Sequence, residues 1–284
     1  MPPYEPALSL VGRLLLAGIF VWAGTLKIFN PEGTQHYMAA YGLTFGTMLL
    51  YLGATLVEIA GGVSLALGYL TREAAFMLVA FMVVVTGIFH THLVDANQII
   101  HLLKNVAIIG GLLYVAAYGP GAISREAQMG MPSDDDAMRP YRSRLSLAGR
   151  MFIAAIFLVS GSNKLLDPQG TQQYMAAMGI VSATGLFYAA AVGLELGGAL
   201  VLLVGVWARI GAGALVLLMI PATVMFHRTS MSFVIDAAVQ DQQFHLMKNL
   251  AIMGGLLYVL AYGADRIALN ARQQADPEAE PSKS

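Results

Sequence analysis

Two glutamates lie inside long apolar stretches of the chain and are the first candidates for chemistry. Glu58 stands near the middle of the apolar segment 47–70, and Glu195 has the same place in the segment 183–207. A carboxyl group inside a membrane is costly unless it is paired or protonated, so such residues usually serve a function. We expect both glutamates to be catalytic, as proton carriers or as hydrogen-bond partners of a ligand carbonyl. The alternative is a paired carboxyl group that only joins helices.

Two lysines lie where they can reach these glutamates. Lys27 and Lys164 stand near the ends of the apolar segments 9–29 and 146–166. A lysine at this depth can extend its ammonium group to the membrane interface, pair with a carboxylate, or bind an anion. Because an unpaired charge inside a membrane costs several kcal/mol, we predict that each glutamate lies within reach of a cationic side chain of its own half. The candidate partners of Glu58 are Lys27, His90 and Lys104.

A third polar group stands at the start of the last apolar segment in each half. His101, Lys104 and Asn105 are spaced i, i+3 and i+4, so they share one face of a helix. The same spacing recurs in the second half, and a histidine also ends the apolar segment that precedes each group. These further residues are His245, Lys248, Asn249, His90 and His227.

The residue types in this group suit proton transfer and anion binding. Histidine exchanges protons near neutral pH, so we expect all four histidines to be catalytic together with the glutamates. The expected substrate-binding residues are Lys27, Lys104, Asn105, Lys164, Lys248 and Asn249. The alternative is that the histidines only cap loops at the membrane surface.

The absence of cysteine from the chain excludes several kinds of redox chemistry within it. Disulfide relays, iron–sulfur clusters and covalently attached c-type haem all need cysteine side chains. The alternatives are a b-type haem with histidine ligands, or a metal bound by Glu58, His90 and His101, but no helix carries a paired-histidine pattern. We therefore predict no metal site, and a bound quinone or a partner protein for any electron transfer.

The elements that must position these residues are membrane-spanning helices. Of the 284 residues, 57% are hydrophobic and 12% are charged, whereas a soluble domain has about 25% charged residues. The apolar residues form blocks long enough to cross a hydrocarbon layer of about 30 Å, which requires helices. We therefore predict an all-α membrane protein with eight transmembrane helices. The expected spans are 9–29, 47–70, 73–94, 102–119, 146–166, 183–207, 209–227 and 245–263.

The second half of the chain repeats the first. A shift of 137 residues places Arg13 on Arg150 and aligns the halves without a gap as far as His90 on His227. Because each half has an even number of spans, the halves form two tandem four-helix bundles in parallel orientation, related by an axis along the membrane normal. The expected divisions are a first unit at 1–120, a cytoplasmic linker at 121–145, a second unit at 146–265 and a disordered cytoplasmic tail at 266–284.

Positive charges are distributed unevenly between the two membrane faces that this arrangement creates. With both termini in the cytoplasm, 11 of the 16 Lys and Arg residues lie on the inner side, as the positive-inside rule expects. We therefore predict a multi-pass protein of the inner (plasma) membrane with both termini and the linker cytoplasmic. The lysines and histidines described above then lie toward the outer face.

Three strings shared by the halves resemble the DoxX/DoxD family of four-helix membrane proteins. They are G-x-x-K-x-x-x-P-x-G-T-Q-x-Y-M-A-A-x-G at 24–42 and 161–179, E-x-x-G at 58–61 and 195–198, and H-L-x-K-N at 101–105 and 245–249. The family includes the large subunit of thiosulfate:quinone oxidoreductases. The resemblance implies a membrane redox subunit that passes electrons from an outer-side donor to membrane quinone.

Two other functions fit the same features. The chain can be a non-catalytic scaffold subunit of a larger membrane complex, or a conduit for small solutes or ions lined by buried glutamates and histidines. The expected partners are the lipid bilayer and a redox subunit in the membrane or on its outer side, and nothing in the sequence indicates binding of nucleic acid.

The halves differ most in the outer loop before the last span. The second loop, at 228–244, is longer than the first and contains Asp236 and Asp241. An acidic loop repels an anion but can dock a basic partner surface. We therefore expect the first unit to retain the anion site and the second to serve assembly, so that Lys104 matters more for turnover than Lys248.

Overall fold

The computed structural model describes residues 3–90, 95–132, 134–226 and 237–264. Within these ranges every regular element is an α-helix, and eight of the helices are long and apolar enough to cross a membrane. The predicted all-α membrane fold is therefore confirmed. The expected tail at 266–284, His227 and Asp236 lie outside the described residues.

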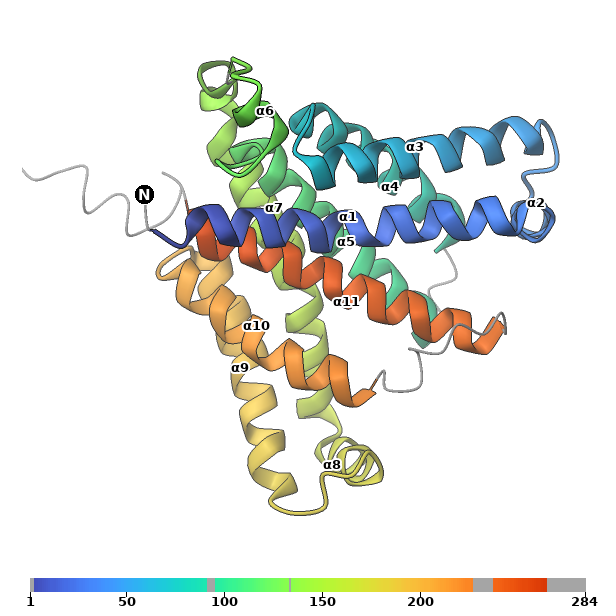
Figure 1. The fold of residues 1–284 in the computed structure, drawn as a ribbon. Helices are drawn as coiled ribbons and strands as arrows, with labels where there is room; N and C mark the ends of the chain where they lie inside the picture. The colour runs from blue at the N-terminus through green and yellow to red at the C-terminus, as the bar shows by residue number, and fades with distance from the viewer. Residues whose placement is uncertain (1–2, 91–94, 133, 227–236, 265–284) are drawn as a thin grey trace, which may run out of the picture.

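Each unit contains four spanning helices and one short helix after the first span. The first unit consists of α1 (Glu5–Phe29), the short α2 (Pro31–Ala40), α3 (Thr47–Leu67), α4 (Thr71–Phe89) and α5 (Ala96–Tyr118). The second consists of α7 (Asp135–Leu166), the short α8 (Pro168–Ala177), α9 (Thr184–Val204), α10 (Ala208–Phe226) and α11 (Ala237–Tyr262). The single-turn helix α6 (Arg125–Gln128) joins the two units along the chain and lies at the edge of the molecule where α7 begins (Figure 1).

The same local device starts both short helices. The Asn30 side chain accepts a hydrogen bond from the Gly33 backbone N–H at 3.0 Å, and the Asp167 side chain accepts one from Gly170 at 2.9 Å. Asparagine and aspartate are preferred at this position, and the proline that follows each of them suits the first helical turn. The shared P-x-G-T-Q string therefore ends the first span soon after the lysine. A separate helix begins four residues after the lysine in each unit.

Three spanning helices begin at least six residues earlier than the apolar blocks indicate. α5 begins at Ala96 rather than 102, α7 at Asp135 rather than 146, and α11 at Ala237 rather than 245. Hydropathy reports only the part of a helix inside the hydrocarbon layer, and polar turns beyond that layer remain helical where they are capped. The Asp95 side chain, for example, accepts a hydrogen bond from the Asn97 backbone N–H at 2.8 Å. Part of the predicted linker and part of the predicted second outer loop are therefore helix.

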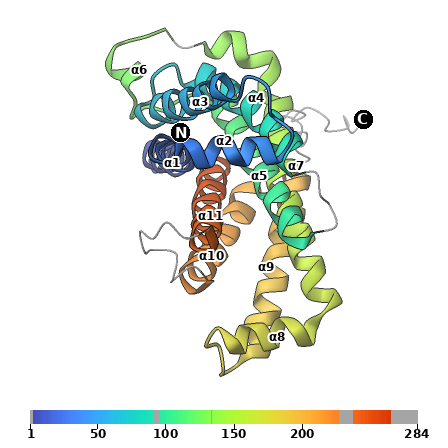
Figure 2. The same ribbon diagram turned by 90° about the vertical axis from the view of Figure 1, so that its right-hand side faces the viewer.

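The two units interlock through their first and fourth spans. Neighbouring spans of each unit pack in chain order, but α1 also packs against α11 of the second unit, and α7 packs against α5 of the first. α5 and α11 pack against each other at the centre (Figures 1 and 2). Each fourth span therefore contacts the first span of the other unit, while α2 and α8 lie apart at separate corners of the molecule.

Glycines permit the closest of these contacts. A Cβ atom added to Gly111 of α5 would lie 2.9 Å from the Cα of Gly255 of α11, and one added to Gly12 of α1 would lie 2.8 Å from the carbonyl oxygen of Gly254. Small residues let transmembrane backbones approach closely, which increases van der Waals contact where lipid offers no hydrophobic driving force. The glycine pair of each fourth span therefore permits two contacts, one with the other fourth span and one with the first span of the other unit.

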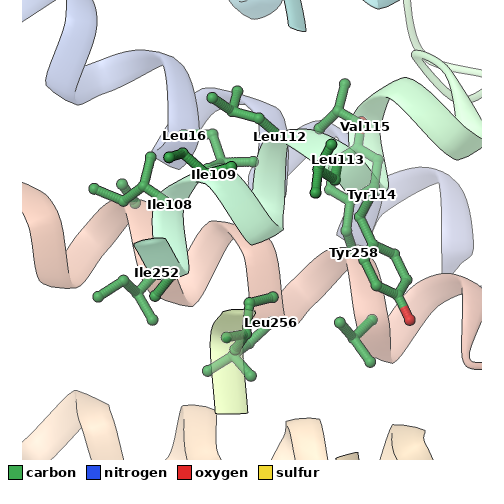
Figure 3. Packing of buried hydrophobic residues seen from close by; sticks show 14 of the residues in the cluster. Leu16, Ile108, Ile109, Leu112, Leu113, Tyr114, Val115, Ile252, Leu256 and Tyr258 are labelled. Atoms are coloured by element: carbon green, nitrogen blue, oxygen red, sulfur yellow. The ribbon is translucent and has the colours of Figure 1, made fainter. Parts of the chain in front are cut away.

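The core is centred on α5 and α11 (Figure 3). Ile108 and Leu112 of α5 and Ile252 and Leu256 of α11 are fully or almost fully buried there, together with Leu16 of α1. Leu16 belongs to the first unit, and it packs in one core with the fourth spans of both units.

Two buried tyrosines add polar contacts between the units near the ends of the fourth spans. The Tyr114 hydroxyl donates to the carbonyl oxygen of Gly263 at 3.0 Å, and the Tyr258 hydroxyl donates to that of Gly119 at 3.2 Å. The last carbonyl groups of a helix have no partner within the helix. Each tyrosine therefore satisfies a carbonyl group at the end of the other unit's fourth span.

We expect the substitution Gly111→Ala to destabilise the protein, because its methyl group would force α5 and α11 apart at about 1–3 kcal/mol. Thermal unfolding in detergent measures this effect. Gly193→Ala in α9 is the matched control, since a Cβ atom at Gly193 has no neighbour within 4 Å. Equal melting temperatures for the two variants would contradict the close central contact.

The orientation predicted from the positive charges can be tested with reporter fusions. A fluorescent protein fused after Gly130, between α6 and α7, should mature in the cytoplasm, and alkaline phosphatase fused after Gly42, between α2 and α3, should be active outside it. Exchanging the two reporters gives the control. Phosphatase activity at Gly130 together with fluorescence at Gly42 would show that the orientation is opposite to the predicted one.

Candidate functional site

The two membrane glutamates are paired with the lysines of their own units. Lys27 Nζ lies 2.9 and 2.8 Å from the two carboxylate oxygens of Glu58, and Lys164 Nζ lies at the same distances from those of Glu195. Glu58 stands in the middle of α3 and is buried, and its side chain is only 8% exposed. The predicted pairing is therefore confirmed, with the lysine extending from the last turn of the first span.

The glycine that precedes each lysine explains the shared G-x-x-K string. A Cβ atom at Gly24 would lie 2.8 Å from the side chain of Ile59, and one at Gly161 would lie 2.7 Å from that of Leu196. The absence of a side chain at this position brings α1 close to α3, and α7 close to α9, beside the glutamate. The glycine thus sets the helix separation across which the lysine reaches.

The second ion pair has one additional partner. The Ser160 hydroxyl donates to Glu195 at 3.2 Å and accepts from Lys164 at 2.6 Å, whereas Ala23 stands at the equivalent position of the first unit. The ion pair of the first unit therefore has more hydrogen-bonding capacity free for another group.

The fourth-span residues form a second polar group, which joins the two units. Lys248 Nζ lies 2.8 Å from His101 Nδ1, and Lys104 Nζ lies 3.0 Å from His245 Nδ1. The centroids of the two histidine rings are 4.4 Å apart. The predicted helix faces are correct, but each lysine contacts the histidine of the other unit. We call His101, Lys104, His245 and Lys248, together with the polar residues one turn before each histidine, the central cluster.

The residues one turn before the histidines are Asn97 and Asp241. Asp241 lies 3.0 Å from His101 Nε2 and 3.7 Å from His245 Nε2, and Asn97 Oδ1 lies 3.0 Å from His245 Nε2. The interpretation of Asp241 as part of an acidic outer loop is therefore wrong, because the residue lies in α11 and faces the histidines. Its position four residues before His245 was the available signal, since residues at i and i+4 share a helix face.

His90 lies beside the central cluster, against His101. The His90 ring stacks on His101 with centroids 5.4 Å apart, and its Nδ1 lies 2.8 Å from Gln98 Oε1. Burial lowers the pKa of His90, and the positive charge of Lys248 lowers it further, while the Gln98 contact acts against both. The lowered pKa favours the uncharged form of His90.

The asparagines of the H-L-x-K-N strings bond to neighbouring helices. Asn105 Nδ2 donates to the Thr86 hydroxyl at 3.0 Å, and Asn249 Nδ2 donates to that of Thr223 at 3.3 Å. Each contact ties the fourth span of a unit to its third. Asn105 Oδ1 has no hydrogen-bond partner among the described residues, so it can accept a hydrogen bond from a ligand.

A cavity of about 510 Å³ connects the ion pair of the first unit with the central cluster. Its walls come from α1 to α5 and, across the interface, from α11, and the larger part of its lining surface is apolar. The predicted site residues that line it are Lys27, Glu58, His90, His101, Asn105 and Lys248. Lys104, Lys164, Glu195, His245 and Asn249 do not line this cavity. The cavity of the first unit is therefore completed by a lysine of the second.

Comparison with known proteins gives the following matches. A family model described as DoxX matches residues 8–91 and 145–228, which together make up more than half of the chain. The chain is 37% identical over 124 residues to "Inner membrane protein YqjF" of Escherichia coli (strain K12), covering 44% of this chain and 93% of that protein. It is 33% identical over 126 residues to "Inner membrane protein YphA" of the same organism, covering 42% and 89%. No solved structure matches the chain significantly.

We expect Glu58→Gln to destabilise the protein by on the order of 3 kcal/mol, because it leaves the Lys27 charge without a partner. The double variant Lys27→Met/Glu58→Gln should recover most of this loss, since it removes both charges. Melting temperatures in lipid nanodiscs compare the stability of these two variants with that of the unaltered protein. Asp136→Asn provides the control, because the ion pair of Asp136 with Arg139 is exposed and should contribute little. A double variant no more stable than Glu58→Gln would show that the charges do not stabilise each other.

Proposed function

Because the chain belongs to the DoxX family of membrane proteins, we propose that it is a membrane redox subunit that binds a quinone in the cavity of its first unit. The observation that supports this proposal is the cavity itself, in which apolar walls surround an ion pair and a histidine–lysine pair. The volume of about 510 Å³ lies within the range of about 300–1,000 Å³ found for small-molecule sites.

The lining residues suit a planar ring with two polar ends. Phe81, Phe89 and Phe244 provide aromatic surface, against which a quinone ring can pack. Lys27 of the ion pair and Lys248 of the central cluster line the cavity and can donate hydrogen bonds to the quinone oxygens. The two groups come from α1 of the first unit and α11 of the second, so a ring between them would be fixed in orientation.

The proton-carrying groups match the stoichiometry of quinone reduction. Conversion of a quinone to a quinol takes up two electrons and two protons. In the proposed mechanism the Lys27–Glu58 pair supplies one proton and the His101–Lys248 pair supplies the other. The electrons come from a donor on the outer side, either an inorganic anion such as thiosulfate or the redox centre of a partner subunit.

The exchange of lysines between the units changes which lysine serves this cavity. The sequence places Lys104 with the first unit, but Lys104 bonds to His245, and Lys248 lines the first-unit cavity. Our proposal therefore reverses the expected importance of the two lysines. Lys248 is the lysine that we assign to the quinone site.

We expect Lys248→Met to weaken the binding of a short-chain benzoquinone by at least about 10-fold, because a hydrogen bond to a charged group contributes about 1.5–3 kcal/mol. Binding is measured by equilibrium dialysis with the protein in nanodiscs, and quinone retained from the native membrane is identified by mass spectrometry.

Lys104→Met is the matched control, because Lys104 makes the equivalent histidine contact but does not line the cavity. Equal weakening by both substitutions would place the effect in the central cluster rather than in the cavity. A protein that binds no quinone but is recovered with a stoichiometric partner would instead support a scaffold, and ion flux in liposomes would support a conduit.

A further inference from the structure

The central cluster contains three side chains of the kinds that bind metal ions, contributed by both units. His101 of α5 and Asp241 and His245 of α11 each place one ligand atom within 4.8 Å of the other two. We propose that these residues form a binding site for a divalent transition-metal ion, of which Zn²⁺ is the best suited. Neither unit contains this set of ligands alone.

The distances fit a single ion bound between the three residues. His101 Nε2 lies 3.0 Å from one carboxylate oxygen of Asp241, and His245 Nε2 lies 3.7 Å from the other. Ligand atoms about 2.0–2.2 Å from a tetrahedral ion lie roughly 3.3–3.5 Å from one another. Small movements of these side chains would therefore complete the coordination without a change in the helices.

The types of ligand select the class of ion. Two imidazole nitrogens and a carboxylate suit zinc and related first-row divalent ions, whereas magnesium and calcium prefer oxygen ligands alone. Asn97 Oδ1 lies 3.0 Å from His245 Nε2 and can add a fourth ligand. Since the Asp241 side chain is 41% exposed, an ion can enter from water at this end of α5 and α11.

The two lysines lie behind the histidine ligands of this site. Because the ion takes Nε2 of each histidine, the ring hydrogen moves to Nδ1, where Lys248 and Lys104 lie at 2.8 and 3.0 Å. Metal-bound histidines usually donate this hydrogen to a neighbouring acceptor. An ammonium group cannot accept it, so the flexible lysine side chains turn away from the rings when the ion binds.

The sequence predicts no metal site because the ligands are separated along the chain and come together only where the units interlock. His101 and Asp241 are 140 residues apart. This inference does not rest on the proposed quinone function, because metal binding is measured without quinone. Failure of one proposal therefore leaves the other open to its own test.

The test uses the full chain, purified in detergent with a tag that contains no histidine and treated with a chelator. Calorimetric titration with Zn²⁺ should show one ion bound per chain, and Co²⁺ should give the visible absorption of a nitrogen-ligated ion. Asp241→Asn should weaken zinc binding by at least about 10-fold and should fold normally, because asparagine already stands at the equivalent Asn97. His36→Gln, which changes an exposed histidine on α2, should bind zinc as the unaltered protein does.

A carboxylate transfer distinguishes a metal ligand from a residue that only supports packing. The double variant Asn97→Asp/Asp241→Asn restores one carboxylate at the equivalent position beside His245, and it should recover the zinc affinity lost in Asp241→Asn. Absence of zinc binding by the unaltered chain, or the same affinity in Asp241→Asn, would overturn the proposal. Loss of affinity that the double variant does not recover would also overturn the assignment of Asp241 as a ligand.

Discussion

The structure depends on the need of every charged group inside the membrane for a partner. A buried charge without one costs several kcal/mol, and lipid supplies no hydrogen bonds. The two glutamates obtain their partner from the first span of the same unit, whereas the fourth-span lysines obtain theirs from the other unit. Even the fully buried Arg13 has backbone partners, since it donates to the carbonyl oxygen of Leu65 at 3.0 Å, at the end of α3. Helix packing and charge pairing therefore determine each other.

The interlocked arrangement follows from this requirement together with the glycines of the fourth spans. Gly111 and Gly255 let α5 and α11 touch along the centre, and this contact brings the rings of His101 and His245 together, with their centroids 4.4 Å apart. The same contact places Lys248 in the wall of the first-unit cavity. The cavity and the interface between the units therefore share residues, so a change at either affects both.

Much of the fold was predictable because membrane constraints act locally along the chain. The spans follow from apolar length, and the Lys27–Glu58 pair follows from the depth of Glu58 and the position of Lys27. Helix starts were misjudged at α5, α7 and α11, since their first turns are polar and extend beyond the hydrocarbon layer. The exchange of lysines was not predictable, because the spacing of His101 and Lys104 defines a helix face but not the helix that this face meets. That choice depends on three-dimensional packing between nearly identical segments.

The covalent joining of the two units has a consequence for the chemistry at their interface. In a symmetric dimer of identical units, the positions of Asn97 and Asp241 would carry the same residue, either two amides or two carboxylates. Gene fusion releases the halves from that identity, so one amide and one carboxylate can face the same pair of histidines. Two carboxylates would repel each other there, and two amides would carry no charge. A single chain can thus place different residues on the two sides of the site between its units, whereas a homodimer must place the same residue on both sides.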